Sequence, residues 1–225
     1  MDELHELLSR LRPRLSDRKL RLLACAAARK AWHLLKDSRS RRAIEVAEAF
    51  ADGQATANEL RVARGAANHV REGQAAFDVG YVAGLPGRGR SFSTVWWRSL
   101  TDGLRFPAGA LAAAAARAAP SDGPWQAARD AAWAAARDAQ RALAMDMVGP
   151  ECAVVLDPTW LTWNDSAVRK LAQAIYAEHR FDDLPILADA LEEAGCADAD
   201  ILGHCRSGGE HARGCWVVDL LLGKQ

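Results

Sequence analysis

Residues whose side chains can bind a metal ion or carry out redox chemistry gather at one place near the C-terminus. Three of the five cysteines and two of the six histidines fall within a stretch of twenty residues, at Cys196, His204, Cys205, His211 and Cys215. Zinc is held by thiolate, imidazole and carboxylate ligands, with four protein ligands in structural sites. Any chemistry in this chain is therefore expected here.

The proposed ligand set is Cys196, His204, His211 and Cys215. His211 and Cys215 are four residues apart and would share one face of a helix. Four protein ligands would make a closed structural site with no position for a substrate. The spacing contains no CxxC pair and fits no zinc-finger pattern, so buried core cysteines and helix-end histidines are the alternative interpretation. The expected cofactor is either none or a structural zinc ion.

The elements that must position these side chains are predicted to be helices. Ser16 begins a segment in which apolar residues recur every three or four positions, and Thr56 and Glu59 are spaced as a capping box. Gly53 is placed to end the helix before it. We expect an all-α protein, a bundle or array of about nine to eleven helices with an alanine-rich central helix and a compact C-terminal helical unit.

Changes in composition divide the chain into three parts. Residues 1–83 form an N-terminal helical block, 84–150 a loop and an alanine-rich helical connector, and 151–225 the C-terminal unit. The run GLPGRGRS at 84–91 predicts a loop. The connector repeats WQAARDAA as WAAARDAQ, which places Arg129 and Arg137 one helical turn from Trp125 and Trp133.

The charge is balanced overall but not along the chain. Residues 1–45 contain 12 basic and 6 acidic side chains, whereas residues 151–225 contain 6 basic and 13 acidic ones. The basic N-terminal segment offers Arg12, Arg14 and Arg18 as candidate nucleic-acid contacts. Such a charge run is more often a solvated helix face.

The amino-acid sequences of several segments are similar to those of a large family of uncharacterised bacterial proteins. These segments are SDRKLRLLACAAARKAWHLL, SRRAIEVAEAFADG, LDPTWLTWND, KLAQAIYAEHRFDDLPILADALEEAGC and GHCRSGGEHARGCWVVDLLLGK. The resemblance covers both ends of the chain and implies a helical N-terminal block, an alanine-rich middle of variable length and a similar tail. It implies no activity. Similar proteins carry paired cysteines where this chain has Cys25-Ala26-Ala27, so no metal or redox role is expected for Cys25.

The sequence contains few residues whose spacing indicates catalysis. No nucleophile with a base, and no pair of carboxylates, has a spacing that indicates catalysis. We therefore expect a non-catalytic interaction or scaffold module whose partner is another protein or a second copy of itself. A zinc-stabilised module, a nucleic-acid binder and a weak enzyme are the alternatives. The acidic start and the lack of a long apolar run predict a cytoplasmic protein with no membrane partner.

Overall fold

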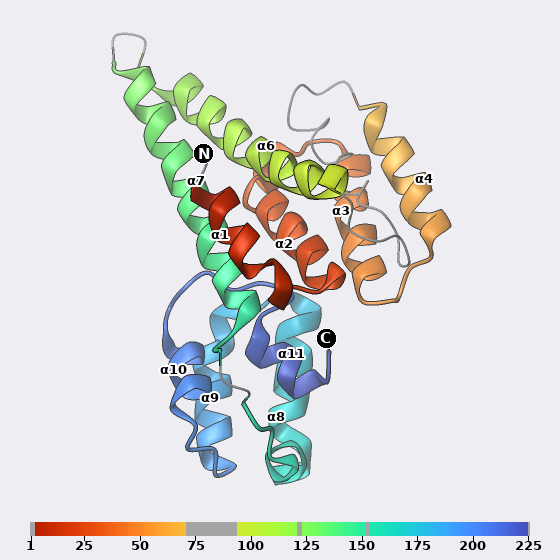
Figure 1. Ribbon diagram of the computed structural model, residues 1–225, viewed down its shortest axis with the longest axis vertical. Helices are drawn as coiled ribbons and strands as arrows, with labels where there is room; N and C mark the ends of the chain where they lie inside the picture. The colour runs from red at the N-terminus through yellow and green to blue at the C-terminus, as the bar shows by residue number, and fades with distance from the viewer. Residues whose placement is uncertain (1–2, 71–93, 121–122, 152–153, 225) are drawn as a thin grey trace. The chain divides into compact units, whose positions relative to one another are not determined.

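The structure is a computed structural model, and it describes residues 3–70, 94–120, 123–151 and 154–224. Within these ranges the chain forms ten α-helices, three short 3-10 helices and no strand, as the sequence predicted (Figure 1). The chain divides into two structural units, Met1–Arg141 and Ala142–Gln225, and the boundary falls inside helix α7. The predicted loop at 84–91 lies outside the described residues. None of the described helices is both long and apolar enough to cross a membrane.

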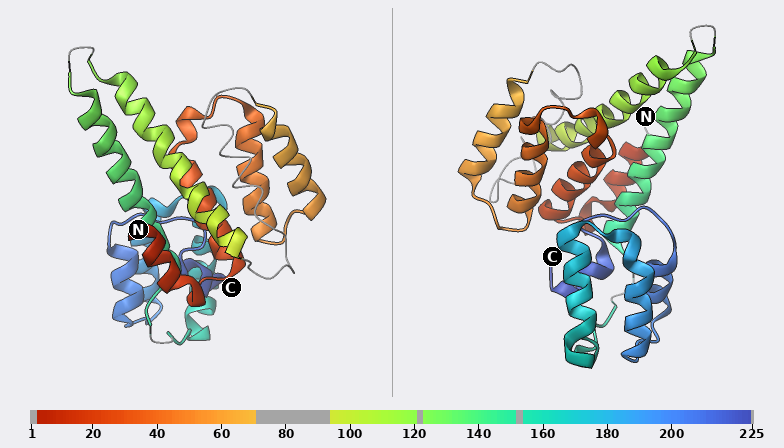
Figure 2. Two further views of the ribbon diagram at one scale, coloured as in Figure 1. Left: turned by 45° about the horizontal axis from the view of Figure 1, so that its top comes forward. Right: turned by 180° about the vertical axis from the view of Figure 1, so that it is seen from behind.

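The helices of the first unit are α1 (Glu3–Leu11), α2 (Asp17–Lys30), α3 (Ser38–Ala51), α4 (Ala57–Asn68), α6 (Thr94–Ala118) and most of α7 (Trp125–Val148). The 3-10 helices η1 (Arg12–Arg14) and η2 (Trp32–Leu34) follow α1 and α2. Helix α2 packs against both α3 and α6, and α3 packs against α4 (Figure 2).

Local sequence signals explain where these helices begin and end. Ser16 caps α2 by accepting a hydrogen bond from the Lys19 amide, at 3.3 Å. Thr56 and Glu59 form the predicted capping box at the start of α4. Gly53 has a φ of 75°, which fits its predicted role after α3.

The contacts inside the first unit are apolar with a few charged pairs. Leu20, Leu23 and Ile44 are almost completely buried, and Arg29 of α2 binds Glu48 of α3, with an Nη2–Oε2 distance of 2.8 Å. In α7 the guanidinium carbons of Arg129 and Arg137 lie 5.7 Å and 6.0 Å from the ring centroids of Trp125 and Trp133. The duplicated segment therefore makes the predicted cation–π contacts.

The second unit contains the end of α7 and helices α8 (Pro158–Glu178), α9 (Leu184–Glu193), α10 (Ala199–Arg206) and α11 (Trp216–Leu222), with the 3-10 helix η3 (Phe181–Asp183) before α9. Helix α9 packs against α8 and α10, and α11 packs against α8 (Figure 1). The helical path of α8 is interrupted at 163–166, where Asn164, Asp165 and Ser166 have positive φ.

The core of the second unit is one apolar cluster shared by α8, α9, α10 and α11. Val168, Ile175, Leu187 and Ile201 are fully buried in it, and Cys196 is 2% exposed. Gly195, with a φ of 93°, follows the last turn of α9. Helices α10 and α11 contain only eight and seven residues. Helices of this length are marginal in water, so their stability depends on packing against this cluster.

Candidate metal centre

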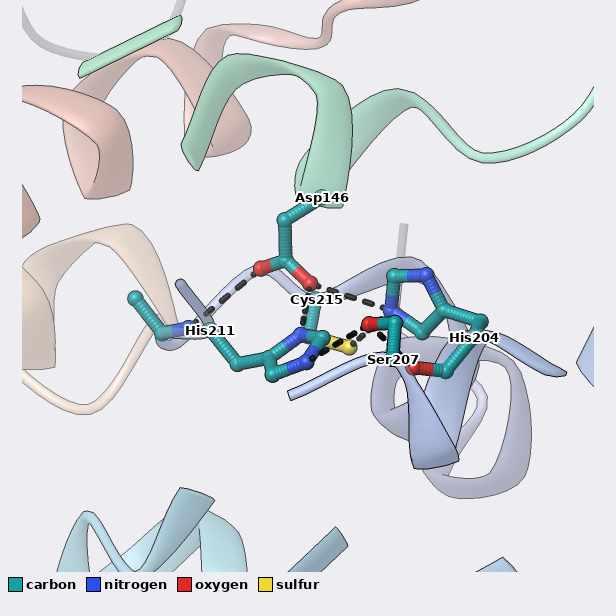
Figure 3. A network of polar contacts seen from close by, with 6 residues as sticks. Asp146, His204, Ser207, His211 and Cys215 are labelled. Atoms are coloured by element: carbon teal, nitrogen blue, oxygen red, sulfur yellow. Dashed lines mark hydrogen bonds and ion pairs between the residues drawn. The ribbon is translucent and has the colours of Figure 1, made fainter. Parts of the chain in front are cut away.

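Four side chains converge in the second unit at the end of α7 (Figure 3). Asp146 lies in the last turn of α7, His204 on α10, His211 in the loop between α10 and α11, and Cys215 at the residue before α11. The expectation that His211 and Cys215 share one face of a helix was therefore wrong, because both lie in the loop. One ligand atom from each residue lies within 4.8 Å of the other three. The group can therefore hold a metal ion.

Two glycines allow the end of α7 to approach the start of α11. A β-carbon on Gly149 would lie 2.8 Å from Cγ of Trp216, and one on Gly214 would lie 3.3 Å from three side-chain atoms of Met147. Both glycines have positive φ, 69° and 99°, which L-amino acids with side chains rarely adopt. This close approach brings Asp146 to the loop that carries His211 and Cys215.

The loop itself is held to α8 by Arg213. Its Nε and Nη2 atoms donate hydrogen bonds to the carbonyl oxygens of Tyr176 and Ala177, each at 3.1 Å. The guanidinium carbon also lies 5.0 Å from the ring centroid of Tyr176. Because those carbonyls end a helix, they are natural acceptors for a cation. Arg213 therefore fixes the loop between His211 and Cys215.

The distances show how closely the four groups approach. Oδ1 of Asp146 lies 2.7 Å from Nδ1 of His211 and 3.0 Å from Nε2 of His204. The same Nε2 atom lies 3.3 Å from Sγ of Cys215. The other carboxylate oxygen of Asp146 accepts a hydrogen bond from the Ala212 amide at 3.3 Å. One oxygen is thus held by the backbone while the other faces the imidazoles.

The two imidazole rings are oriented by further contacts. The rings of His204 and His211 meet edge to face, with centroids 4.9 Å apart, and His204 meets Trp216 in the same way at 5.2 Å. Ser207 Oγ lies 3.5 Å from Nε2 of His211, the ring nitrogen that faces away from Asp146. Such outer contacts fix the ring orientation of histidine ligands in metal sites.

Burial separates these groups from solvent to different degrees. The side chains of Asp146 and His211 are 2% and 7% exposed, that of His204 is 17% exposed, and Cys215 is fully buried. Burial alone would raise the pKa of Asp146, but the hydrogen bonds from His204 and His211 hold its pKa below the ordinary value. The carboxylate is therefore ionised at neutral pH.

The pKa of the Cys215 thiol is shifted in the opposite direction from that of Asp146. Burial, and then the negative charge of Asp146, raise the pKa of Cys215 well above its ordinary value. A buried thiol in this state is protonated and is a poor nucleophile. A bound cation would reverse this preference, because metal coordination deprotonates a thiol. Cys215 is thus suited to ligate a metal and unsuited to attack a substrate unaided.

The four ligand atoms lie near the spacing of a zinc site, and they must shift to reach it. Bonds of ~2.0–2.3 Å in a tetrahedron place ligand atoms roughly 3.3–3.8 Å apart. The Cys215–His204 pair, at 3.3 Å, lies at the lower end of that range. The Asp146–His204 and Asp146–His211 pairs, at 3.0 Å and 2.7 Å, must open, and any pair near the 4.8 Å limit of the group must close. Two anionic and two neutral ligands would also balance the charge of a divalent ion.

A metal-free arrangement can be written for the same atoms. Asp146 would then accept hydrogen bonds from His204 Nε2 and His211 Nδ1. In this arrangement the network would serve only to satisfy a buried carboxylate. The two possibilities differ in a measurable quantity, the metal content of the protein.

The structure brings three of the four predicted ligands together. His204, His211 and Cys215 belong to the group, and Asp146 takes the fourth position in place of Cys196. Cys196 lies after α9 in the apolar core, where burial raises the pKa of its thiol. Cys205 is also buried, which raises the pKa of its thiol to about 12. Both therefore resemble the core cysteines of the alternative interpretation.

Sequence reasoning missed Asp146. A signal was present, because this acid stands in the chain between the apolar residues Leu143 and Met147, both of which are buried in α7. An ionised side chain at such a position requires a partner.

The three arginines proposed for nucleic-acid contact lie in different environments. Arg12 and Arg14 are exposed in η1. Arg18 is only 10% exposed in its side chain, and its Nε donates to Oδ1 of Asp52 at 3.0 Å. The charge of Arg18 is therefore paired with Asp52 inside the first unit. Nucleic-acid binding through Arg12, Arg14 and Arg18 stays a prediction.

Comparisons of the chain with known protein families, with curated proteins and with solved structures found no match. The function is therefore inferred from the geometry of the four-residue group.

Proposed function

We propose that the second unit is a zinc-binding helical module in which Asp146, His204, His211 and Cys215 hold one ion. The observation that carries the proposal is the convergence of one ligand atom from each residue within 4.8 Å. These atoms come from the end of α7, from α10 and from the loop before α11. An ion bound to them would connect segments that are otherwise joined by loops.

The donor set favours zinc over other common ions. Magnesium and calcium prefer oxygen ligands, whereas a thiolate with two imidazoles suits zinc. One carboxylate, two imidazoles and one thiolate also supply the four donors of a tetrahedral site. The described cysteines are free thiols, which fits a reducing compartment and supports our proposal that the protein is cytoplasmic.

The role that we propose for the ion is structural. Helices α10 and α11 are short, and a peptide of such length is a marginal helix in water. Metal binding to the folded state stabilises a protein by about 2.7 kcal/mol when the free ion exceeds its dissociation constant 100-fold. The ion would thus hold α10 and α11 against the end of α7.

The wider role that we propose is a non-catalytic interaction or scaffold module. Exposed apolar side chains support it, because such residues are available to a partner protein or to a second copy of the chain. Trp125 and Trp133 in the first unit and Met145 and Val155 in the second are 47%, 37%, 51% and 82% exposed.

Zinc content and thermal unfolding of the full chain test the structural role. We expect one zinc per chain and a lower unfolding midpoint after chelation, restored by adding zinc. His211→Ala should lack zinc and should not respond to the chelator. His69→Ala, which changes an exposed histidine at the end of α4, is the matched control and should behave as the wild type. Metal-free wild-type protein whose midpoint does not change on adding zinc would refute the proposal.

A further inference from the structure

A cavity of about 430 Å³ opens beside the four-residue group. Three of the proposed ligands, Asp146, His204 and His211, line it, whereas Cys215 is not among its lining residues. The remaining wall includes Met145, Pro150 and Trp216, and the carboxylate residues Asp200 and Glu210 also line it. This volume lies within the range of small-molecule sites, which are mostly apolar with a few polar groups.

The lining places a bound ion at the wall of the cavity. The buried thiol of Cys215 would lie on its protein side, and His204, the most exposed of the four side chains, would lie on the cavity side. The sequence predicted a closed site, but an ion in this position can be reached from the cavity. Zinc sites with three protein ligands can expand from four to five ligands when a further donor approaches, and the cavity would allow the same expansion here.

We propose that the bound ion accepts one further, exchangeable ligand from this cavity, and that this ligand is a neutral nitrogen donor of the imidazole class. The proposal rests on the zinc site proposed above. Such a donor would come from a small molecule or from a histidine side chain of a partner. Binding forms one metal–nitrogen bond and leaves the four protein ligands in place.

Charge argues for a neutral donor. The thiolate of Cys215 and the carboxylate of Asp146 already balance a divalent ion. A further anion would leave a net negative charge in a cavity that Asp200 and Glu210 also line. A neutral imidazole adds no charge, and its flat ring suits a wall formed by Trp216, Met145 and Pro150.

Cobalt(II) replaces zinc in a test that uses the full chain, because its visible absorption depends on the number of ligands. Four-coordinate cobalt absorbs strongly, and a fifth ligand weakens and shifts the bands. We expect imidazole to produce a saturable change of this kind while the cobalt stays bound after gel filtration. Acetate at the same concentrations should produce none.

Two glycine substitutions test whether imidazole binds in the cavity. A β-carbon on Gly209 would meet Ser207 Oγ at 3.5 Å and His211 Nε2 at 4.0 Å, so Gly209→Leu places a side chain in the cavity without a clash at Cβ. It should weaken imidazole binding at least about tenfold, or by 1.4 kcal/mol. Gly203→Leu on α10 is the matched control, because nothing lies within 4 Å of its β-carbon and it does not line the cavity. Met145→Trp is a second variant that narrows the cavity.

Three outcomes would overturn the inference. Bound cobalt whose spectrum does not respond to imidazole would show a closed site, and the zinc proposal would survive. Loss of cobalt to imidazole would show competition for the ion rather than a fifth ligand. A protein that binds no cobalt or zinc would refute both proposals.

Discussion

The Nε2 atom of His204 lies 3.0 Å from Oδ1 of Asp146, although 58 residues separate the two in the chain. The contact joins α10 to the end of α7 within the second unit. His211 and Cys215 complete the group from the loop that precedes α11. A single buried carboxylate at the end of α7 thus meets side chains from two other segments, and substitutions at and around it should reveal what this arrangement does.

The two cysteines Cys215 and Cys196 should differ in their effect on zinc. Cys215→Ser removes the sulfur ligand of the proposed site and should reduce zinc content strongly. Cys196→Ser changes a cysteine that is almost as buried but lies outside the group, so zinc content should be unchanged. Elemental analysis of both variants makes the comparison. The opposite pattern would restore Cys196 as a ligand and exclude the geometry described above.

Gly149 and Gly203 should respond in opposite directions to substitution by alanine. Gly149→Ala forces a side chain into positive φ and against Trp216, and should cost roughly 2 kcal/mol of unfolding free energy. Gly203→Ala adds a methyl group in open space on α10 and should stabilise by about 1 kcal/mol. Chemical denaturation measures both. Equal effects would mean that the end of α7 does not pack closely on Trp216.

The capping box of α4 should make stability depend on pH in the acidic range. Hydrogen bonds from the backbone and hydroxyl of Thr56 lower the pKa of Glu59 below its ordinary value. A group with a lowered folded-state pKa stabilises the fold above its unfolded pKa, ~4.3 for glutamate, and that contribution is lost as the pH falls through the folded-state pKa. The contribution of Glu59 is measured as the difference in thermal unfolding midpoint between the wild type and Glu59→Gln at each pH. A difference that does not become smaller as the pH falls would contradict the prediction.

Arg18 should matter for stability more than the neighbouring exposed arginines. Arg18→Gln removes the cation from the Asp52 carboxylate, whose side chain is 1% exposed, and should cost about 2 kcal/mol. Arg12→Gln changes an exposed residue of η1 and should cost less than ~0.5 kcal/mol. Urea unfolding of the two variants tests this difference. Equal losses of unfolding free energy in the two variants would contradict a stabilising ion pair between Arg18 and Asp52.

Local features were predictable from the sequence because they depend on neighbouring residues. The capping box at Thr56 and Glu59, the left-handed Gly53 and the cation–π contacts of Trp125 and Trp133 involve residues within one or two helical turns. The all-helical class also followed, because apolar residues recur at the period of a helix.

The composition of the site depended on contacts that no local pattern records. His204, His211 and Cys215 were predicted from their types and nearness in the chain, but nearness also suggested Cys196, which the fold directs into the apolar core. Asp146 reaches the group only because Gly149 and Gly214 permit a close approach between distant segments. Such an approach is set by tertiary packing, so the fourth residue could not be found from spacing.

X-ray absorption at the zinc edge of the purified full chain tests the central claim most directly, because it reports the atoms bound to the ion. The four-residue site predicts one sulfur at ~2.3 Å and three nitrogen or oxygen atoms at ~2.0–2.2 Å, with a fourth such atom when imidazole is present. The sulfur contribution should be unchanged in Cys196→Ser protein, because Cys196 lies outside the group. A spectrum with no sulfur, or with two or more, would contradict a centre built from Asp146, His204, His211 and Cys215.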